Sequence, residues 1–115
     1  MQKFIKSFHY AFEGILHAIK TERNFKIHLI AAVIVIFSGL VTGLEIVEWY
    51  VIMMLIGGML ALELLNSAIE RAINLVTLER FPLAKQAKDL AAGAVLIFAI
   101  TSAIIGLFIF VPKWI

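Results

Sequence analysis

Long apolar stretches alternate with short polar segments along this chain. A helix needs about 20 mostly apolar residues to cross the hydrocarbon core of a bilayer, and three stretches approach or exceed that length. The pattern predicts an all-α integral membrane protein in which three transmembrane helices are joined by short connections. We place the spans at residues 27–44, 49–73 and 89–111, with a polar connection at residues 74–88.

A different pattern precedes the first span. Apolar side chains recur there every three or four residues, and lysine, glutamate and histidine occupy other positions, as is typical of an amphipathic helix. We predict that residues 1–26 form a surface helix at the membrane interface, with lysines near anionic headgroups. A helix packed on the transmembrane bundle is an equally good interpretation. The apolar face consists of Phe4, Phe8, Ala11, Phe12, Ile15, Leu16 and Ile19.

The composition agrees with a membrane protein of one domain, residues 1–115. Hydrophobic residues make up 63% of the chain and charged residues only 16%, which leaves too little polar surface to cover a water-soluble bundle. Cysteine is absent, so disulfides, thiolate metal sites and cysteine nucleophiles are excluded. The N-terminal stretch lacks the features of a signal peptide, and we expect the chain to start at Met1.

The positions of the basic residues predict the orientation in the membrane. Of the ten lysines and arginines, five lie in residues 1–28, four in residues 71–88, and the last is Lys113. Cytoplasmic segments of membrane proteins carry the excess of basic residues. The N-terminus and the second connection are therefore predicted to be cytoplasmic, and the C-terminus extracytoplasmic.

Five polar residues interrupt the second apolar stretch, at spacings that place them on one face of a helix. At 100° per residue they fall within a sector of roughly 100°. Ionisable groups at membrane depth are costly and usually functional. Two acids on one face indicate a site for a cation, and a divalent metal that carries phosphate is the favoured candidate. The face consists of Glu63, Asn66, Ser67, Glu70 and Asn74.

Charged residues near the ends of the spans complete a possible site for phosphoryl transfer. Glu22 precedes the first span at a level similar to Glu70, and Mg²⁺ typically takes one or two carboxylates together with water and phosphate oxygens. Lys88 is placed to neutralise phosphate oxygens, and Asp89 to cap the third helix or to bind a nucleotide. Glu63 lies deeper and is placed to accept a proton from a lipid hydroxyl.

Simpler interpretations exist for each of these residues. The polar face could serve only for contacts between helices, Lys88 could anchor its helix at the interface, and Asp89 could be only an N-cap. The histidines show no metal-ligand spacing and are interpreted as interfacial side chains. Glycine-rich phosphate loops are absent, which excludes a soluble type of nucleotide fold. Two rival functions are a small transporter or channel subunit and a structural membrane adaptor.

Two segments carry a resemblance to a known family: ELLNSAIE at residues 63–70 and AKQAKDLAAGAVL at residues 84–96. They closely resemble the bacterial diacylglycerol kinase and undecaprenol kinase family of small integral-membrane lipid kinases, and the resemblance covers nearly the whole chain. It implies phosphorylation of a lipid hydroxyl, with Mg²⁺ and ATP as cofactors. It further implies a homotrimer with active sites shared between protomers, which contacts lipid, ATP and the bilayer but no nucleic acid.

The resemblance also implies roles for individual residues. Glu63 matches the proposed catalytic base, and Asn66 matches an amide near the transferring phosphoryl group. Glu22 and Glu70 match the magnesium ligands. The residues expected to bind the nucleotide and its metal are Tyr10, Glu22, Glu70, Glu79, Lys88 and Asp89.

Two positions depart from the family pattern. Arg80 stands where relatives often carry a histidine, and Asn74 where an aspartate is common, so the purine contacts and part of the metal environment stay open. The segments KSFHYAFEG at residues 6–14 and TERNFKIHL at residues 21–29 resemble the Gram-positive branch, whose members resemble undecaprenol kinases. Undecaprenol is therefore the favoured acceptor, and diacylglycerol the alternative.

Overall fold

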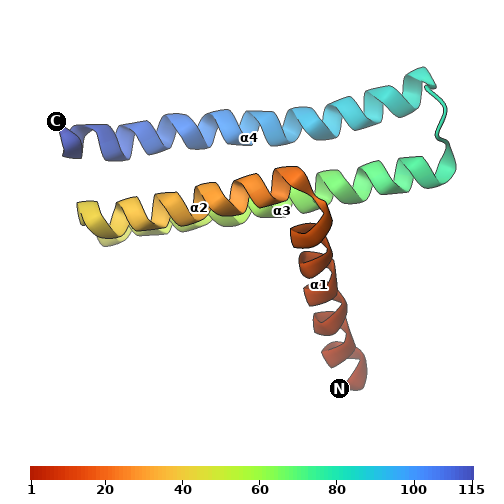
Figure 1. The fold of residues 1–115 in the computed structure, drawn as a ribbon, viewed down its shortest axis with the longest axis horizontal. Coiled ribbons are helices and arrows are strands. Elements are labelled where there is room, and N and C mark those ends of the chain that lie inside the picture. The colour runs from red at the N-terminus through yellow and green to blue at the C-terminus, as the bar shows by residue number, and fades with distance from the viewer.

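The structure, a computed structural model, describes all 115 residues and is entirely helical outside short connections. Helices α2, α3 and α4 lie side by side, and α1 projects away from them at a steep angle (Figure 1). The last three helices are each long and apolar enough to cross a membrane. The prediction of an all-α integral membrane fold with three spans is confirmed. The helices are α1 (Gln2–Thr21), α2 (Arg23–Thr42), α3 (Ile46–Val76) and α4 (Pro82–Trp114).

Side-chain contacts hold the three long helices level at one end of the bundle. Trp114 Nε1 of α4 donates a hydrogen bond to Thr42 Oγ1 of α2 at 2.9 Å, and Lys113 Nζ forms an ion pair with Glu48 of α3 at 3.0 Å. We call this end the clasped end. The opposite end, where the chain turns from α1 into α2, is called the open end.

The unequal lengths of the helices determine what the open end presents. Helix α2 has 20 residues and spans about 30 Å, close to the thickness of the hydrocarbon core. Helices α3 and α4 have 31 and 33 residues, or about 46 and 50 Å. Because the helices are level at the clasped end, α3 and α4 project beyond the first residue of α2 at the open end (Figure 1). The polar face of α3 lies at and beyond this level.

A single residue separates α1 from α2. Glu22 is extended, with φ −97° and ψ 111°, and this backbone ends α1 at Thr21 and lets α2 begin at Arg23 in a new direction. The predicted surface helix continued to residue 26 and the span began at residue 27. Hydropathy marks where a segment becomes apolar, whereas the helix itself starts at the break in the backbone, four residues earlier.

The connection between α3 and α4 is shorter than predicted. Only residues 77–81 lie outside the helices, and the rest of the predicted connection at 74–88 is helical. Pro82 is the first residue of α4, a position that suits proline because the missing amide hydrogen has no helical partner there. The polar residues 82–88 therefore form a rigid extension of the third span.

Helices α3 and α4 approach each other closely at Gly58. A β-carbon built on Gly58 would lie 2.5 Å from Phe98 Cζ of α4, so the space that a side chain would need is filled by the Phe98 ring. The neighbouring Gly57 has no atom within 4 Å of such a carbon. Gly58 thus sets the distance between the two helices that carry most of the candidate site.

Candidate active site

The polar face of α3 is divided among the three other helices. Glu63 contacts α2 through His28, and Ser67 lines a pocket together with residues of α1. Asn74 accepts a hydrogen bond from Lys88 of α4 through its Oδ1 at 2.6 Å. One helical face therefore holds the open end of the bundle together, and Glu63 is its most buried member, at 3% exposed.

Glu63 has a partner that the sequence analysis did not assign. Its Oε1 lies 3.5 Å from Nε2 of His28, which stands on α2. We interpreted the histidines as interfacial side chains, and the structure adds that His28 lies between α2 and α3 in contact with a buried acid. A histidine near the start of an apolar span, at the depth of a buried acid on the next span, is the signal that could have identified the pair.

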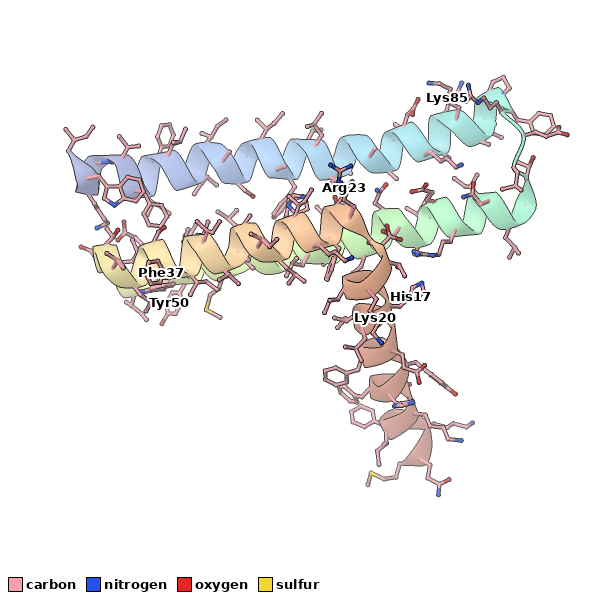
Figure 2. All side chains as sticks on the ribbon, viewed as in Figure 1. His17, Lys20, Arg23, Phe37, Tyr50 and Lys85 are labelled. Atoms are coloured by element: carbon pink, nitrogen blue, oxygen red, sulfur yellow. The ribbon has the colours of Figure 1, made fainter.

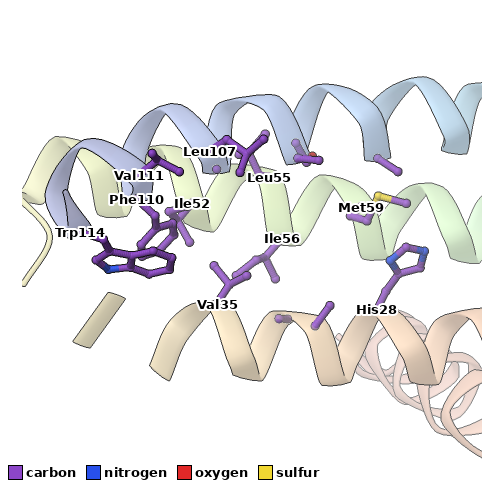
Figure 3. Close-up of a pocket in the computed structure, with 16 residues that line it drawn as sticks. His28, Val35, Ile52, Leu55, Ile56, Met59, Leu107, Phe110, Val111 and Trp114 are labelled. Atoms are coloured by element: carbon purple, nitrogen blue, oxygen red, sulfur yellow. The ribbon is translucent and has the colours of Figure 1, made fainter. Parts of the chain in front are cut away.

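An apolar cavity opens beside this pair. It has a volume of about 390 Å³ and lies between α2, α3 and α4, with His28 near one end and Trp114 near the other (Figure 3). Its few polar groups include Ser102, whose buried hydroxyl has no hydrogen-bond partner. On α4 the lining includes Ala99, Ala103 and Gly106, whose small size leaves the space. Glu63 does not line this cavity, but its partner His28 does, so the buried acid lies one side chain away from a space suited to hydrocarbon.

Three of the residues predicted to bind a nucleotide come together at the open end. Glu79, Lys88 and Asp89 line one hollow of about 290 Å³ between the connection and the start of α4. Most of its lining is polar, in contrast to the apolar cavity. Ligand pockets typically have volumes of about 300–1,000 Å³, so this hollow is large enough for part of a nucleotide.

Two ionic groups of this hollow, Lys85 and Asp89, are paired with each other. Lys85 donates a hydrogen bond to Asp89 Oδ2 at 2.6 Å, and this bond, together with the charge of the carboxylate, holds the pKa of Lys85 above its ordinary value of 10.5. Lys85 lies near the turn between α3 and α4, before the apolar part of the helix (Figure 2). Phosphates that enter the hollow would meet two lysines within one helical turn.

The predicted magnesium ligands also lie at the open end. Glu22 Oε1 forms an ion pair with Arg71 at 2.6 Å, and Arg71 is in turn 3.3 Å from His17 Nε2. Glu70 is exposed and forms no ion pair within the chain. Both acids offer the hard oxygen ligands that Mg²⁺ prefers, and Arg71 is paired with only one oxygen of Glu22, but the chain gathers no cluster of three acids or histidines here.

Two further predicted site residues, Asn66 and Tyr10, form no side-chain hydrogen bond or ion pair within the chain. Asn66 is half-buried on the polar face, one turn from Glu63 and Glu70. Tyr10 lies on α1 and is 64% exposed, and α1 leads away from the bundle (Figure 1). Within one chain, therefore, Tyr10 is not brought to the hollow that Lys88 and Asp89 line.

The arrangement suits a reaction between an apolar and an ionic reactant. The histidine that contacts the buried Glu63 carboxylate lines the apolar cavity, and lysines and acids lie beyond it toward the projecting ends of α3 and α4. An alcohol with a long hydrocarbon chain and a phosphate donor would approach from opposite directions.

Comparison with known proteins identifies the family. The prokaryotic diacylglycerol kinase model matches residues 9–110. The chain is 53% identical over 113 residues to the undecaprenol kinase of Bacillus subtilis (strain 168), covering 98% of this chain and 92% of that protein. It is 42% identical over 101 residues to a diacylglycerol kinase of Synechocystis sp., covering 87% of this chain and 58% of that protein. A diacylglycerol kinase of Helicobacter pylori (strain J99) is 32% identical over 96 residues, 84% of this chain and 75% of that protein. The chain therefore belongs to the prokaryotic diacylglycerol kinase family.

Proposed function

We propose that this protein is a membrane lipid kinase that transfers the γ-phosphoryl group of ATP to a lipid hydroxyl, with undecaprenol as the acceptor. The similarity to an undecaprenol kinase over 98% of the chain supports the acceptor. The single structural observation that carries the proposal is the buried Glu63 carboxylate, whose partner His28 lines one end of an apolar cavity. Such a position brings a base to the head of a lipid alcohol.

The reaction needs few chemical groups from the protein. The hydroxyl oxygen of the lipid attacks the γ-phosphorus while the bond from phosphorus to the β-γ bridging oxygen breaks, and ADP leaves. Glu63 accepts the hydroxyl proton, and Asn66 lies one turn away to orient the phosphoryl group. Lys88 neutralises charge on the phosphates, while Glu79 and Asp89 position the nucleotide. Catalysis of this kind rests mainly on positioning and charge stabilisation.

We assign the metal to Glu22 and Glu70. Their carboxylates would hold Mg²⁺, which when bound supplies positive charge to the phosphate oxygens. Because this ion usually keeps several water and phosphate ligands, two carboxylates are sufficient. Arg71 holds Glu22 in place from the side of α3.

The orientation in the membrane follows from the charges and the shape of the bundle. The open end carries the basic residues of α1 and of the second connection, and we assign it to the cytoplasm. Helix α1 turns away from the bundle where the first span begins, and its apolar side chains Phe4, Phe8 and Phe12 are exposed. A helix with this pattern lies along the inner membrane surface. The C-terminus is then extracytoplasmic.

A second copy of the chain would complete the site. Tyr10 is remote from the hollow of its own chain, and the hollow lies at the lower limit of pocket volumes. A homotrimer in which α1 of one protomer reaches the hollow of the next places Tyr10 at the nucleotide. Active sites shared between protomers account for both observations.

The proposal is tested by ATP-dependent phosphorylation in mixed micelles, with undecaprenol and diacylglycerol measured side by side. Undecaprenyl phosphate should form, and Glu63→Gln and Glu70→Ala should each abolish turnover. Glu13→Gln is the control, because Glu13 is an exposed acid of α1. Turnover that survives Glu63→Gln contradicts the base, and turnover that survives Glu70→Ala contradicts the metal ligand.

Diacylglycerol is the second candidate acceptor, since two of the relatives are named diacylglycerol kinases. Apolar contacts discriminate only modestly between hydrocarbon chains, so some activity with both lipids is expected. A higher kcat/KM for diacylglycerol would reverse the assignment of the lipid but leave the lipid kinase intact.

A further inference from the structure

The pair of His28 and Glu63 joins two helices at the most buried acid of the chain. Glu63 is 3% exposed, and the imidazole of His28 is the only side chain that forms an ion pair with it. The exposed fraction of the His28 side chain is 25%, so both partners are largely withdrawn from solvent.

A buried carboxylate needs such a partner. An ionised carboxylate without a hydrogen bond or countercharge is strongly destabilised in an apolar environment. The side chain of glutamate also has three rotatable bonds, so a base on one helix is poorly fixed unless a second helix holds it. The distance of 3.5 Å is longer than the about 2.7–3.2 Å of an ordinary N–H···O hydrogen bond, and catalytic contacts of this kind often tighten only when a substrate is bound.

We propose that His28 is a positioning residue for Glu63, an inference that rests on the proposed lipid kinase function. When the contact of 3.5 Å tightens in the substrate complex, Nε2 of His28 donates a hydrogen bond to Oε1 of Glu63, and Oε2 then remains free to accept the proton of the lipid hydroxyl. During transfer the O–H bond of the lipid breaks, its proton moves to Oε2, the new O–P bond forms, and ADP leaves with the electrons of the broken P–O bond. His28 exchanges no proton in this step.

The same imidazole also lines the apolar cavity. A lipid alcohol with its hydrocarbon chain in this cavity would bring its hydroxyl to the end that His28 marks. His28 therefore fixes the base at the point where the acceptor becomes polar, and its removal should affect the chemical step more than nucleotide binding.

Three substitutions separate positioning from packing. His28→Gln keeps an amide that can reach Glu63 at the position of Nε2, His28→Asn carries the same amide on a shorter side chain, and His28→Leu removes the donor. We expect His28→Leu and His28→Asn to lower kcat roughly 10- to 100-fold, the usual effect of losing a group that orients a functional residue. The KM for ATP should stay unchanged, and His28→Gln should restore most of the loss.

The chain offers a matched control in His9 and Glu13. Nε2 of His9 lies 2.6 Å from Glu13, but both side chains are more than half exposed on α1. His9→Leu should leave kcat and both KM values unchanged. In a Glu63→Gln background, His28→Leu should cause no further loss, because two residues that act as one unit are not additive.

The possible results separate this inference from the proposed function. Equal kcat for His28→Gln and His28→Asn, or wild-type kcat for His28→Leu, overturns the inference while Glu63→Gln still tests the base. Turnover retained in Glu63→Gln overturns the proposed base itself. If His28→Leu does not fold, as judged by circular dichroism, the kcat of His28→Gln compared with that of His28→Asn decides whether His28 positions Glu63.

Discussion

Replacing Gly58 with alanine should loosen the contact between α3 and α4, whereas the same change at Gly57 should not. The new β-carbon of Gly58→Ala would lie 2.5 Å from Phe98 Cζ and 3.1 and 3.2 Å from the two ε-carbons of the ring. Carbon atoms in good contact are about 3.5–4.0 Å apart. Cζ lies on the χ2 axis of phenylalanine, so turning the ring about χ2 does not move it, and Phe98 or the helix must shift.

The structure sets the size of the effect. Overpacking of this kind typically costs about 1–3 kcal/mol, and alanine is better than glycine in a helix by up to about 1 kcal/mol. The gain in helix propensity applies equally at Gly57 and Gly58, so it cancels when the two alanine variants are compared. Gly58→Ala should therefore be less stable than Gly57→Ala by about 1–3 kcal/mol.

Unfolding of the detergent-solubilised protein by SDS, followed by far-ultraviolet circular dichroism, measures this difference. Phe98→Leu in the Gly58→Ala background should recover part of the loss, because the shorter side chain leaves room for the methyl group. The reasoning is refuted if Gly58→Ala and Gly57→Ala unfold at the same SDS fraction. It is also refuted if Phe98→Leu lowers the stability of wild type and of Gly58→Ala by the same amount. In either result the ring would not set the helix spacing.

Three further predictions concern the site and the clasped end. Gly106 lines the apolar cavity, and a β-carbon added there meets no atom within 4 Å. Gly106→Leu should therefore fill the cavity and raise the KM for undecaprenol but not the KM for ATP. Gly57→Leu should change neither KM. Lys88→Met should lower kcat about 100-fold or more, as for other lost charge-stabilising donors, while Lys113→Met at the clasped end should retain turnover. The N-cap amide hydrogen bond and then Lys113 hold the pKa of Glu48 below its ordinary value of 4.5. A lowered pKa in the folded state adds stability that is present above the unfolded pKa and lost as pH falls through the folded pKa. Acidification below pH 4.5 should therefore lower the unfolding temperature of wild type more than that of Glu48→Gln, and equal losses would contradict this.

Sequence reasoning predicted the parts of the fold that depend on one helix at a time. The three spans follow from apolar length, and the shared face of Glu63, Glu70 and Asn74 follows from the helical period, because both are local properties. The end of α3 before Pro82 follows from the chemistry of proline. The break at Glu22 was missed, since the residues on both sides of it are compatible with a helix.

Contacts between helices could not be read from the sequence in the same way. His28 meets Glu63, and Arg71 meets Glu22, only because each pair of helices has a particular rotation and offset. Those two quantities depend on packing over the whole interface, including the close approach at Gly58. The resemblance predicted that Glu79, Lys88 and Asp89 belong to one site. This was easier to infer than the contacts between helices, because the three residues are also close in the sequence.

The pairing of charges at the open end has a consequence for how a nucleotide would bind. Glu22 is paired with Arg71, Asp89 with Lys85, and Lys88 donates to Asn74. Each charged group assigned to ATP or its metal, apart from Glu70 and Glu79, therefore has a partner within the chain. Binding of a magnesium nucleotide must exchange these partners for phosphate and metal, so part of the electrostatic attraction is offset by the pairs that break. Exposed ion pairs such as Lys85–Asp89 contribute little to stability, which keeps this exchange easy. Buried Glu63 is different, because its contact with His28 connects two spans and is best retained throughout the reaction.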